Sequence, residues 1–232
     1  MRVQSDTELI TFQHWTLRVR PATEQPARLL LLLHGWTGDE NSMWVLMRNF
    51  SADYWIIAPR APHPAEPSGY SWRAPQAPHS EPFRHSLRSQ GDARGGPRFD
   101  DLRAAADSLI TLVDDYAAQN GLDARQFDVI GFSQGAALTN ALTLLYPERM
   151  RRAGVLAGFL PIGSESLIER RPLNGKPFFV AHGTLDEMVN IEYARQSVEM
   201  LERAGAKVTF CEDEVGHKLS ANCLHALEEF FA

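Results

Sequence analysis

The alternation of short, continuously apolar runs with longer amphipathic segments constrains the fold of this chain most strongly. Apolar runs occur at residues 29–33, 54–58, 127–131, 153–157 and 178–181, with a weaker sixth at 207–211. Strands buried on both faces of a parallel sheet have this appearance. The pattern predicts an α/β fold with a mostly parallel central sheet flanked by helices, and apolar residues before Arg20 predict one or two antiparallel edge strands. A length of 232 residues fits a single domain over 1–232.

Four segments carry the spacing of helices. Apolar residues recur every three or four positions from Phe99 to Tyr116, and Gly121 then ends the segment. A second helix is expected from Gly135 to Tyr146; it is apolar on almost every side, so it belongs in the interior. The third is expected over 191–201, and the last begins near Ser220.

Residues 60–98 break this pattern. Eight of the 14 prolines lie between Pro59 and Pro97, together with four glycines. A long segment without periodicity inside a compact domain is typical of a lid, a binding loop or local disorder. We therefore expect a loop insertion at about 60–98.

Composition and charge exclude several classes of protein. The net charge is −6, so no basic field is available to hold nucleic acid. No apolar run approaches the roughly 20 residues of a membrane span, and residues 1–6 lack the apolar stretch of a secretory signal. We expect a cytoplasmic protein without stable membrane insertion. Cys211 and Cys223 are then expected to be free thiols rather than a bridge. Homo-oligomerisation is left open.

The segment Gly131-Phe132-Ser133-Gln134-Gly135 fits the pattern G-x-S-x-G. It follows an apolar strand and opens the interior helix, which is the context that a nucleophile elbow requires. A serine on so sharp a turn needs neighbours without bulk, and the two glycines meet that need. Ser133 is the predicted nucleophile.

A serine hydroxyl needs a base, which an acid orients. In this scaffold the order along the chain is Ser, then Asp or Glu, then His. His182 precedes the plausible acids and His225 lies inside the last helix, whereas His217 lies in the loop between the last strand and the last helix. His217 is therefore the predicted base. Asp186, just past the strand at 178–181, is the predicted acid, with Glu187 and Asp213 as rivals.

Two N–H donors are needed to stabilise the oxyanion that forms in such a reaction. The first is expected from Gln134, directly after the nucleophile. The second is expected from the loop after the strand at 29–33, with Trp36 as first choice and Thr37 as second. His34 has no partner at metal-ligand spacing, so we expect it to brace this loop. No metal and no cofactor are expected.

Five motifs in order resemble the phospholipase/carboxylesterase family of α/β-hydrolases, which includes bacterial carboxylesterases and acyl-protein thioesterases. They are Leu33-His34-Gly35, Pro59-Arg60-Ala61-Pro62, Gly131-Phe132-Ser133-Gln134-Gly135, His182-Gly183-Thr184-Leu185-Asp186 and Gly216-His217. The resemblance runs from about Leu29 to Phe231 and implies an α/β-hydrolase fold. It also implies a Ser133–Asp186–His217 triad and an oxyanion hole at Trp36 and Gln134.

The expected activity is that of a serine carboxylesterase acting on small esters with short to medium acyl chains. The nearest alternative is an acyl-protein thioesterase or lysophospholipase with the same triad. A non-catalytic binding protein on a hydrolase fold is the remote alternative, since fold alone does not fix function. Tyr70 and Trp72 either line the substrate pocket or anchor the long loop to the body of the domain.

Overall fold

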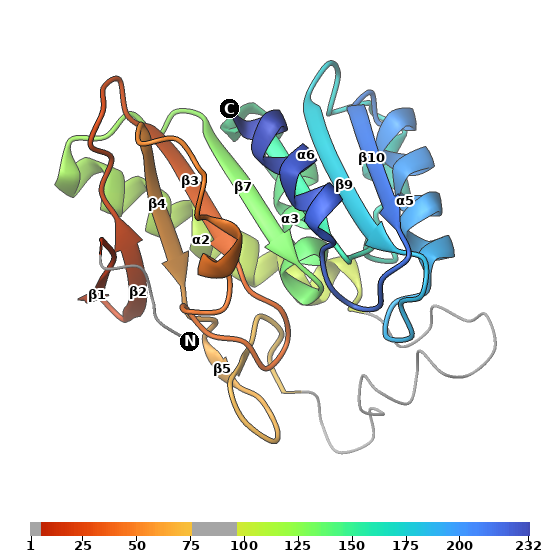
Figure 1. Ribbon diagram of the computed structural model, residues 1–232, viewed down its shortest axis with the longest axis horizontal. Helices are drawn as coiled ribbons and strands as arrows, with labels where there is room; N and C mark the ends of the chain where they lie inside the picture. The colour runs from red at the N-terminus through yellow and green to blue at the C-terminus, as the bar shows by residue number, and fades with distance from the viewer. Residues whose placement is uncertain (1–5, 76–96) are drawn as a thin grey trace.

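A computed structural model describes residues 6–75 and 97–232 and shows a central eight-stranded sheet (Figure 1). The strand order is β1-β2-β4-β3-β7-β8-β9-β10, and all pairs from β4 to β10 are parallel. The strands are β1 (Glu8–Phe12), β2 (Trp15–Arg20), β3 (Arg28–Leu33), β4 (Tyr54–Pro59), β7 (Phe127–Phe132), β8 (Met150–Leu156), β9 (Pro177–Gly183) and β10 (Lys207–Asp213). The predicted antiparallel edge is formed by β1 and β2.

Helices cover both faces of the sheet (Figure 1). One face packs against α2 (Phe99–Asn120), α3 (Gln134–Leu145) and α5 (Ile191–Arg203), and the other against the 3-10 turn η1 (Trp44–Leu46) and α6 (Ala221–Phe231). The remaining helical elements are η3 (Pro147–Arg149) and α4 (Glu165–Ile168). Eleven of the twelve residues of α3 are buried, which confirms that this apolar helix lies in the interior.

The predicted elements are all present, with shifts at their ends. β8 begins at Met150, three residues before the predicted start at Ala153. The sequence pattern missed Arg151 and Arg152 because their guanidinium groups are polar, although both pair with the buried Asp128. β10 is an edge strand with one neighbour, and its alternating exposure explains why its apolar signal was weak.

The segment 60–98 differs in part from the predicted loop. Residues 63–64 and 70–71 form a small antiparallel pair, β5 (His63–Pro64) and β6 (Tyr70–Ser71). Within 60–75 the predicted loop thus contains a short strand pair that the sequence did not indicate, and β6 is also bridged to the loop after β3 at Gly38. Residues 76–96 lie outside the described residues.

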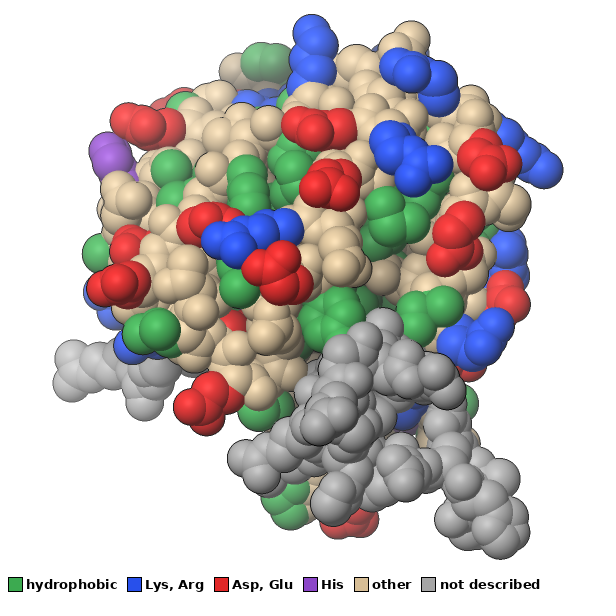
Figure 2. Space-filling view, turned by 90° about the vertical axis from the view of Figure 1, so that its right-hand side faces the viewer, with side chains coloured by type: hydrophobic (Ala, Val, Ile, Leu, Met, Phe, Trp, Pro, Cys, Tyr) green, Lys and Arg blue, Asp and Glu red, His purple; other side chains and the backbone are tan. Residues whose placement is uncertain are grey.

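The outer surface carries charges of both signs. Figure 2, which views the right-hand side of Figure 1, shows acidic and basic side chains interspersed with scattered apolar ones over the described part of that face. No helix among residues 6–75 and 97–232 is long and apolar enough to cross a membrane.

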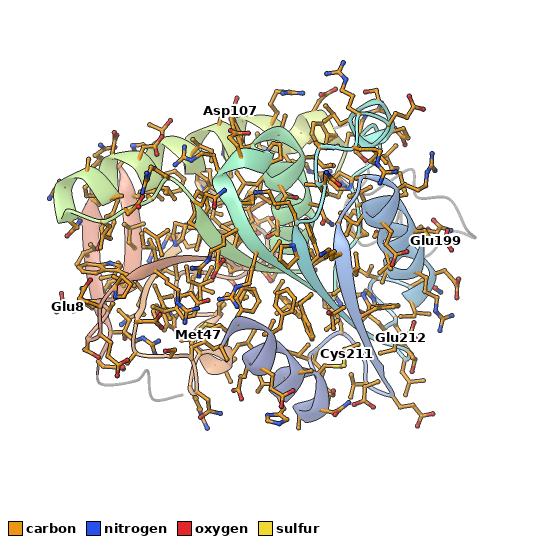
Figure 3. All side chains as sticks on the ribbon, turned by 90° about the horizontal axis from the view of Figure 1, so that it is seen from above. Glu8, Met47, Asp107, Glu199, Cys211 and Glu212 are labelled. Atoms are coloured by element: carbon orange, nitrogen blue, oxygen red, sulfur yellow. A yellow bond between two sulfur atoms is a disulfide. The ribbon has the colours of Figure 1, made fainter. Side chains whose placement is uncertain are left out.

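The prediction of free thiols is wrong: Cys211 and Cys223 form a disulfide (Figure 3). The bond joins the exposed edge strand β10 to α6, where the two Cα atoms lie 5.8 Å apart. Sequence spacing gave no sign of it, because only the packing of α6 against β10 brings the two residues together. Disulfides persist mainly in oxidising compartments, so the bond weighs against the cytoplasmic location that the sequence predicts.

Reduction of the bond should lower the free energy of unfolding. The disulfide closes a loop of 12 residues, and the loop entropy that it removes from the unfolded chain corresponds to about 3 kcal/mol. Denaturant titration of the untreated and the reduced protein measures the difference without any change of sequence. Equal midpoints, together with two titratable thiols in the untreated protein, would contradict the bond.

Candidate active site

Ser133 lies at the sharp turn between β7 and α3. Its backbone has φ 53° and ψ −114°, a left-handed conformation that is strained for any residue with a side chain. Its N–H donates to Leu156 O at 2.9 Å, and its carbonyl oxygen accepts the N–H groups of Ala136 and Ala137 at the start of the helix. These bonds hold the turn, and they present the hydroxyl at the carboxyl edge of the sheet.

The two glycines of the motif allow three backbone segments to meet at this turn. A Cβ on Gly131 would overlap the carbonyl oxygen of Gly135, and a Cβ on Gly135 would overlap that of Leu33 in β3. The requirement for residues without bulk is thus a requirement for close approach between β7, α3 and β3. The structure thus gives a spatial reason for the two glycines of the G-x-S-x-G motif.

Ser133, His217 and Asp186 lie in contact although they come from three separate loops. His217 Nε2 is 2.9 Å from Ser133 Oγ, and His217 Nδ1 is 2.7 Å from Asp186 Oδ2. The ring of Phe132 packs beside the imidazole with the centroids 5.0 Å apart. Nucleophile and base within hydrogen-bond reach, with the base in turn oriented by a third group, is the arrangement that activates a serine.

The loops that carry Asp186 and His217 are tied to each other. The Thr184 N–H donates to Asp213 O at 2.8 Å, and the Leu185 N–H donates to Val215 O at 3.1 Å. Because β9 and β10 are parallel neighbours, the two loops leave the same edge of the sheet. This pairing brings residues 31 positions apart within bonding distance.

The Asp186 carboxylate is buried and has four nitrogen neighbours. Its Oδ1 accepts the N–H groups of Met188 and Val189 at 2.8 and 2.9 Å. Its Oδ2 faces both His217 Nδ1, at 2.7 Å, and His182 Nε2, at 3.3 Å. Burial alone would raise the pKa of Asp186, but the hydrogen bonds from His182, His217 and Val189 outweigh it and hold that pKa well below the ordinary value. The carboxyl is therefore ionised at neutral pH.

The rival residues lie elsewhere. Glu187 is exposed, and the Asp213 carboxylate accepts the neighbouring Glu214 N–H. His225 is exposed on α6 and lies 3.3 Å from Glu229. His182 was not the base predicted from the sequence, and the structure agrees that its side chain does not reach Ser133 directly. The contact between His182 and Asp186 was nevertheless not predicted from the sequence. The only signal for it was that Asp186 follows His182 by four residues, just past the end of β9.

The loop after β3 lies against the nucleophile turn. Thr37 N–H donates to Tyr70 O at 3.0 Å, so it is engaged within the fold. Gln134 is the first residue of α3, and the N–H groups of a first helical turn have no acceptor within the helix.

His34 braces this loop, as the sequence indicated. Its Nε2 accepts the Ala61 N–H at 3.0 Å, so the proton is on Nδ1, which donates to Gly35 O at 2.7 Å. Burial lowers the pKa of His34, which keeps the imidazole neutral and suits both bonds. Groups of three or more metal-binding side chains are absent from the part of the chain that the structure describes.

Trp72 and Tyr70 make the contacts of loop anchors. Trp72 is 1% exposed, its Nε1 donates to His34 O at 2.8 Å, and its backbone N–H donates to Gln134 Oε1 at 2.9 Å. The Tyr70 ring stacks under the Arg60 guanidinium. Neither residue lines the cavity described next. Their role in substrate binding therefore stays a prediction, whereas their anchoring contacts are observed in the structure.

An apolar cavity of about 470 Å³ opens beside the nucleophile turn. Phe132, which precedes Ser133, and Gly35 and Trp36 of the β3 loop form its inner wall. The rest of the lining comes from the segment around η1 and from the start of α6: Thr37, Gly38, Ser42, Met43, Val45, Leu46, Lys218, Leu219 and Leu224. Its size is within the range of small-molecule sites.

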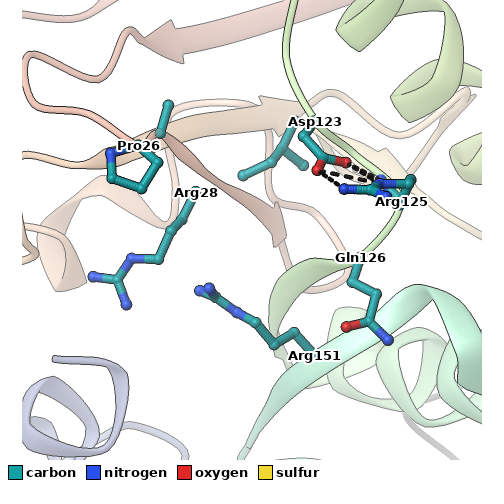
Figure 4. Close-up of a pocket in the computed structure, with 8 residues that line it drawn as sticks. Pro26, Arg28, Asp123, Arg125, Gln126 and Arg151 are labelled. Carbon is teal, nitrogen blue, oxygen red and sulfur yellow. Dashed lines mark hydrogen bonds and ion pairs between the residues drawn. The ribbon is translucent and has the colours of Figure 1, made fainter.

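A second hollow lies at the opposite edge of the sheet, where the strands begin (Figure 4). Its arginines are already paired: Arg125 with Asp123, and Arg151 with the buried Asp128. Because Ser133 follows the other end of β7, this hollow contains none of the three residues that lie in contact. The candidate site is therefore the cavity at the carboxyl edge.

Comparison with known proteins agrees with this geometry. A probable carboxylesterase of rice (Oryza sativa subsp. japonica) is 30% identical over 172 residues, which cover 68% of this chain but 64%, less than two thirds, of the rice protein. Acyl-protein thioesterase 1 of Debaryomyces hansenii is 26% identical, over 80% of this chain and 82% of the yeast protein.

Among solved structures, a carboxylesterase from Mesorhizobium loti superposes with a TM-score of 0.77 at 22% identity. The superposition covers 97% of this chain and 98% of that one, and it shows that the two share the α/β-hydrolase fold. Residues 15–232 match the phospholipase/carboxylesterase family. The match extends over nearly the whole length of the chain, and the sheet order and the nucleophile turn agree with it. The chain therefore belongs to the phospholipase/carboxylesterase family of α/β-hydrolases.

Proposed function

We propose that this protein is a serine carboxylesterase that hydrolyses small carboxylic esters through an acyl-enzyme. The observation that carries the proposal is the continuous chain of contacts from Ser133 Oγ through the His217 imidazole to the buried Asp186 carboxylate. Membership of the family supports it. In this proposal Ser133 is the nucleophile, His217 the base and Asp186 the acid that orients it.

The proposed reaction has two matching halves. Ser133 Oγ attacks the ester carbonyl carbon while its proton passes to His217 Nε2, and the carbonyl oxygen becomes an oxyanion. Collapse of this intermediate expels the alcohol, which takes the proton from His217. Water then attacks the acyl-enzyme by the same route, with His217 again accepting and returning a proton. Asp186 stays ionised throughout and stabilises the imidazolium.

The oxyanion is proposed to bind the backbone N–H groups of Trp36 and Gln134. Gln134 starts α3, so the positive end of the helix dipole is directed at the developing charge. The engagement of Thr37 N–H by Tyr70 O weighs against Thr37 as the second donor. Hydrogen bonds that join the Gln134 side chain to Ser71 and Trp72 attach the β6 segment to the nucleophile turn. They fix these two segments relative to each other.

The cavity supports binding of an acyl group. Its apolar wall from Phe132 to Leu224 suits a hydrocarbon chain, and its volume of about 470 Å³ is within the range of small-molecule sites. Thioester hydrolysis is the second candidate, because the relatives include an acyl-protein thioesterase and the same groups would serve.

Replacing Ser133 by Ala should lower turnover by about four to six orders of magnitude and abolish covalent labelling by a fluorophosphonate. The hydroxyl is the only group in this proposal that forms a bond to the acyl carbon. Turnover of 4-nitrophenyl butyrate and gel detection of the label are the measurements. A labelled or fully active Ala variant would remove Ser133 from the mechanism, and a wild type inert to both would favour the non-catalytic alternative.

Activity across 4-nitrophenyl esters from acetyl to palmitoyl should peak at short to medium chains, as expected for a carboxylesterase that acts on small esters. The quantity to compare is kcat/KM, with Ser133→Ala as the blank for each ester. A peak at palmitoyl would contradict the proposed chain-length preference. Faster hydrolysis of acyl thioesters than of matched oxygen esters would favour the second candidate.

Replacing Asp186 by Asn should lower kcat by about ten-thousandfold. The amide keeps the shape but not the charge, so it holds the His217 ring in the wrong tautomer. Glu187→Gln is a matched control, because it removes the same charge from the adjacent, exposed residue. Comparable losses in both variants would show that the local charge, not the contact with His217, accounts for the effect.

Activity should fall as the pH drops from 8 to 5, because the base must be a neutral imidazole and imidazoles titrate in this range. Asp186 does not contribute to that loss. Its pKa in the folded state is depressed, so its stabilising effect is complete above an ordinary Asp pKa of about 3.9 and is lost only as the pH falls below it. The pH–rate profile, with circular dichroism at each pH, should show loss of rate while the fold persists. A flat profile would contradict the role of His217.

A further inference from the structure

A second imidazole, that of His182, lies beside the same Asp186 oxygen that faces His217. His182 is the penultimate residue of β9, and its side chain is completely buried. Its Nε2 lies 3.3 Å from Asp186 Oδ2 and 2.8 Å from Val189 O. The reaction described above makes no use of this residue.

The contacts determine where the His182 proton lies. Both neighbours of Nε2 are oxygen acceptors, so a bare Nε2 would place its lone pair against theirs, and Nε2 must carry the proton. Nδ1 is buried without a hydrogen-bond partner among the described residues. A proton on Nδ1 would therefore be a buried donor with nothing to receive it, which costs more than an empty lone pair. His182 is accordingly a neutral imidazole protonated at Nε2.

This N–H completes the support of the Asp186 carboxylate. Oδ1 is fixed by two backbone N–H groups, from Met188 and Val189, whereas Oδ2 has only imidazole partners. If His182 did not donate, only His217, the group that changes its protonation in every cycle, would hold Oδ2 in place. The bond to Val189 O also secures the turn that supplies one of the two donors to Oδ1.

The other charged groups near His182 do not compete with Asp186 for the His182 proton. In the β9–β10 register its partner is Glu212, whose carboxylate is bound by Arg195 at 2.8 Å. On the β8 side the neighbouring residues of the two strands, Leu156 and Ala181, are apolar. Asp186 and the Val189 carbonyl are thus the acceptors for the single His182 proton.

We propose that His182 is a positioning residue: its Nε2–H donates to Val189 O and lies 3.3 Å from Asp186 Oδ2, and it thereby holds the turn and the carboxylate where Oδ2 accepts the His217 Nδ1–H. The inference rests on the proposed roles of Ser133, His217 and Asp186. It adds a fourth member to the group, one that touches neither substrate nor nucleophile.

Two substitutions separate the hydrogen bond from mere filling of space. His182→Met is similar in bulk but has no donor, and His182→Gln carries an amide N–H near the position of Nε2. The Met variant should lose about ten- to hundredfold in kcat on 4-nitrophenyl butyrate, as expected for a displaced catalytic group. Its KM should change little, because His182 does not border the cavity. The Gln variant should recover most of the loss.

The pH–rate profile supplies a readout that a loosened core would not produce. Without His182, Asp186 Oδ2 is no longer held against His217 Nδ1, so the carboxylate stabilises the His217 imidazolium less. The acid limb of kcat/KM should therefore move to lower pH in His182→Met and return in His182→Gln. His225→Met, an exposed histidine on α6, is the matched control and should retain the wild-type profile. Wild-type kcat and an unmoved limb in the Met variant would overturn the proposal.

A measurement on the unaltered protein covers the case in which a variant fails to fold. Nitrogen-15 NMR of the histidine rings should show the His182 proton on Nε2. A proton on Nδ1 with a bare Nε2 would contradict the proposal. If the wild type hydrolysed no ester while this signature was present, the proposed function would fail, whereas the inferred contact with Asp186 would stand.

Discussion

The close approach of three backbones at the nucleophile turn is the constraint on which the rest of the site depends. Ser133 has a left-handed backbone conformation, and it is held there because β7, α3 and β3 meet without intervening side chains at Gly131 and Gly135. Such strain persists only where the surrounding structure over-determines it. The buried helix α3 and its parallel neighbours supply that surrounding structure, which is why the most apolar helix follows the reactive serine.

The edge of the sheet at which this turn lies also gathers the other parts of the site. Parallel strands end at one edge, so the loops after β3, β7, β9 and β10 all begin there. Hydrogen bonds between the last two loops bring Asp186 to His217, and the disulfide between β10 and α6 brackets the His217 loop on both sides. The loop that carries His217 is thus flanked by two residues that are covalently joined.

Electrostatics separates Asp186 from the other acidic residues nearby. Glu187 is adjacent in sequence but exposed, whereas Asp186 is buried among four nitrogen neighbours that favour its ionised form. The difference is one of surroundings and not of residue type. Donors on both oxygens suit a group that has to keep its charge while its partner gains and loses a proton.

Much of the fold and of the candidate site could be predicted from the sequence alone. Periodicity and turn residues are local properties, so the parallel strands of the central sheet, the interior position of α3 and the nucleophile turn could be predicted directly. Chain order and strand ends then indicated Ser133, Asp186 and His217, which the structure brings into contact.

Tertiary structure decided what depends on contacts between distant segments. The Cys211–Cys223 bond requires α6 to pack on β10, and the anchoring of Trp72 requires β6 to lie against His34 and Gln134. The contact between His182 and Asp186 needs the turn after β9 to fold back on its own strand. None of these leaves a periodic trace in the sequence, because packing between elements is set by their three-dimensional approach and not by the spacing of residues within them.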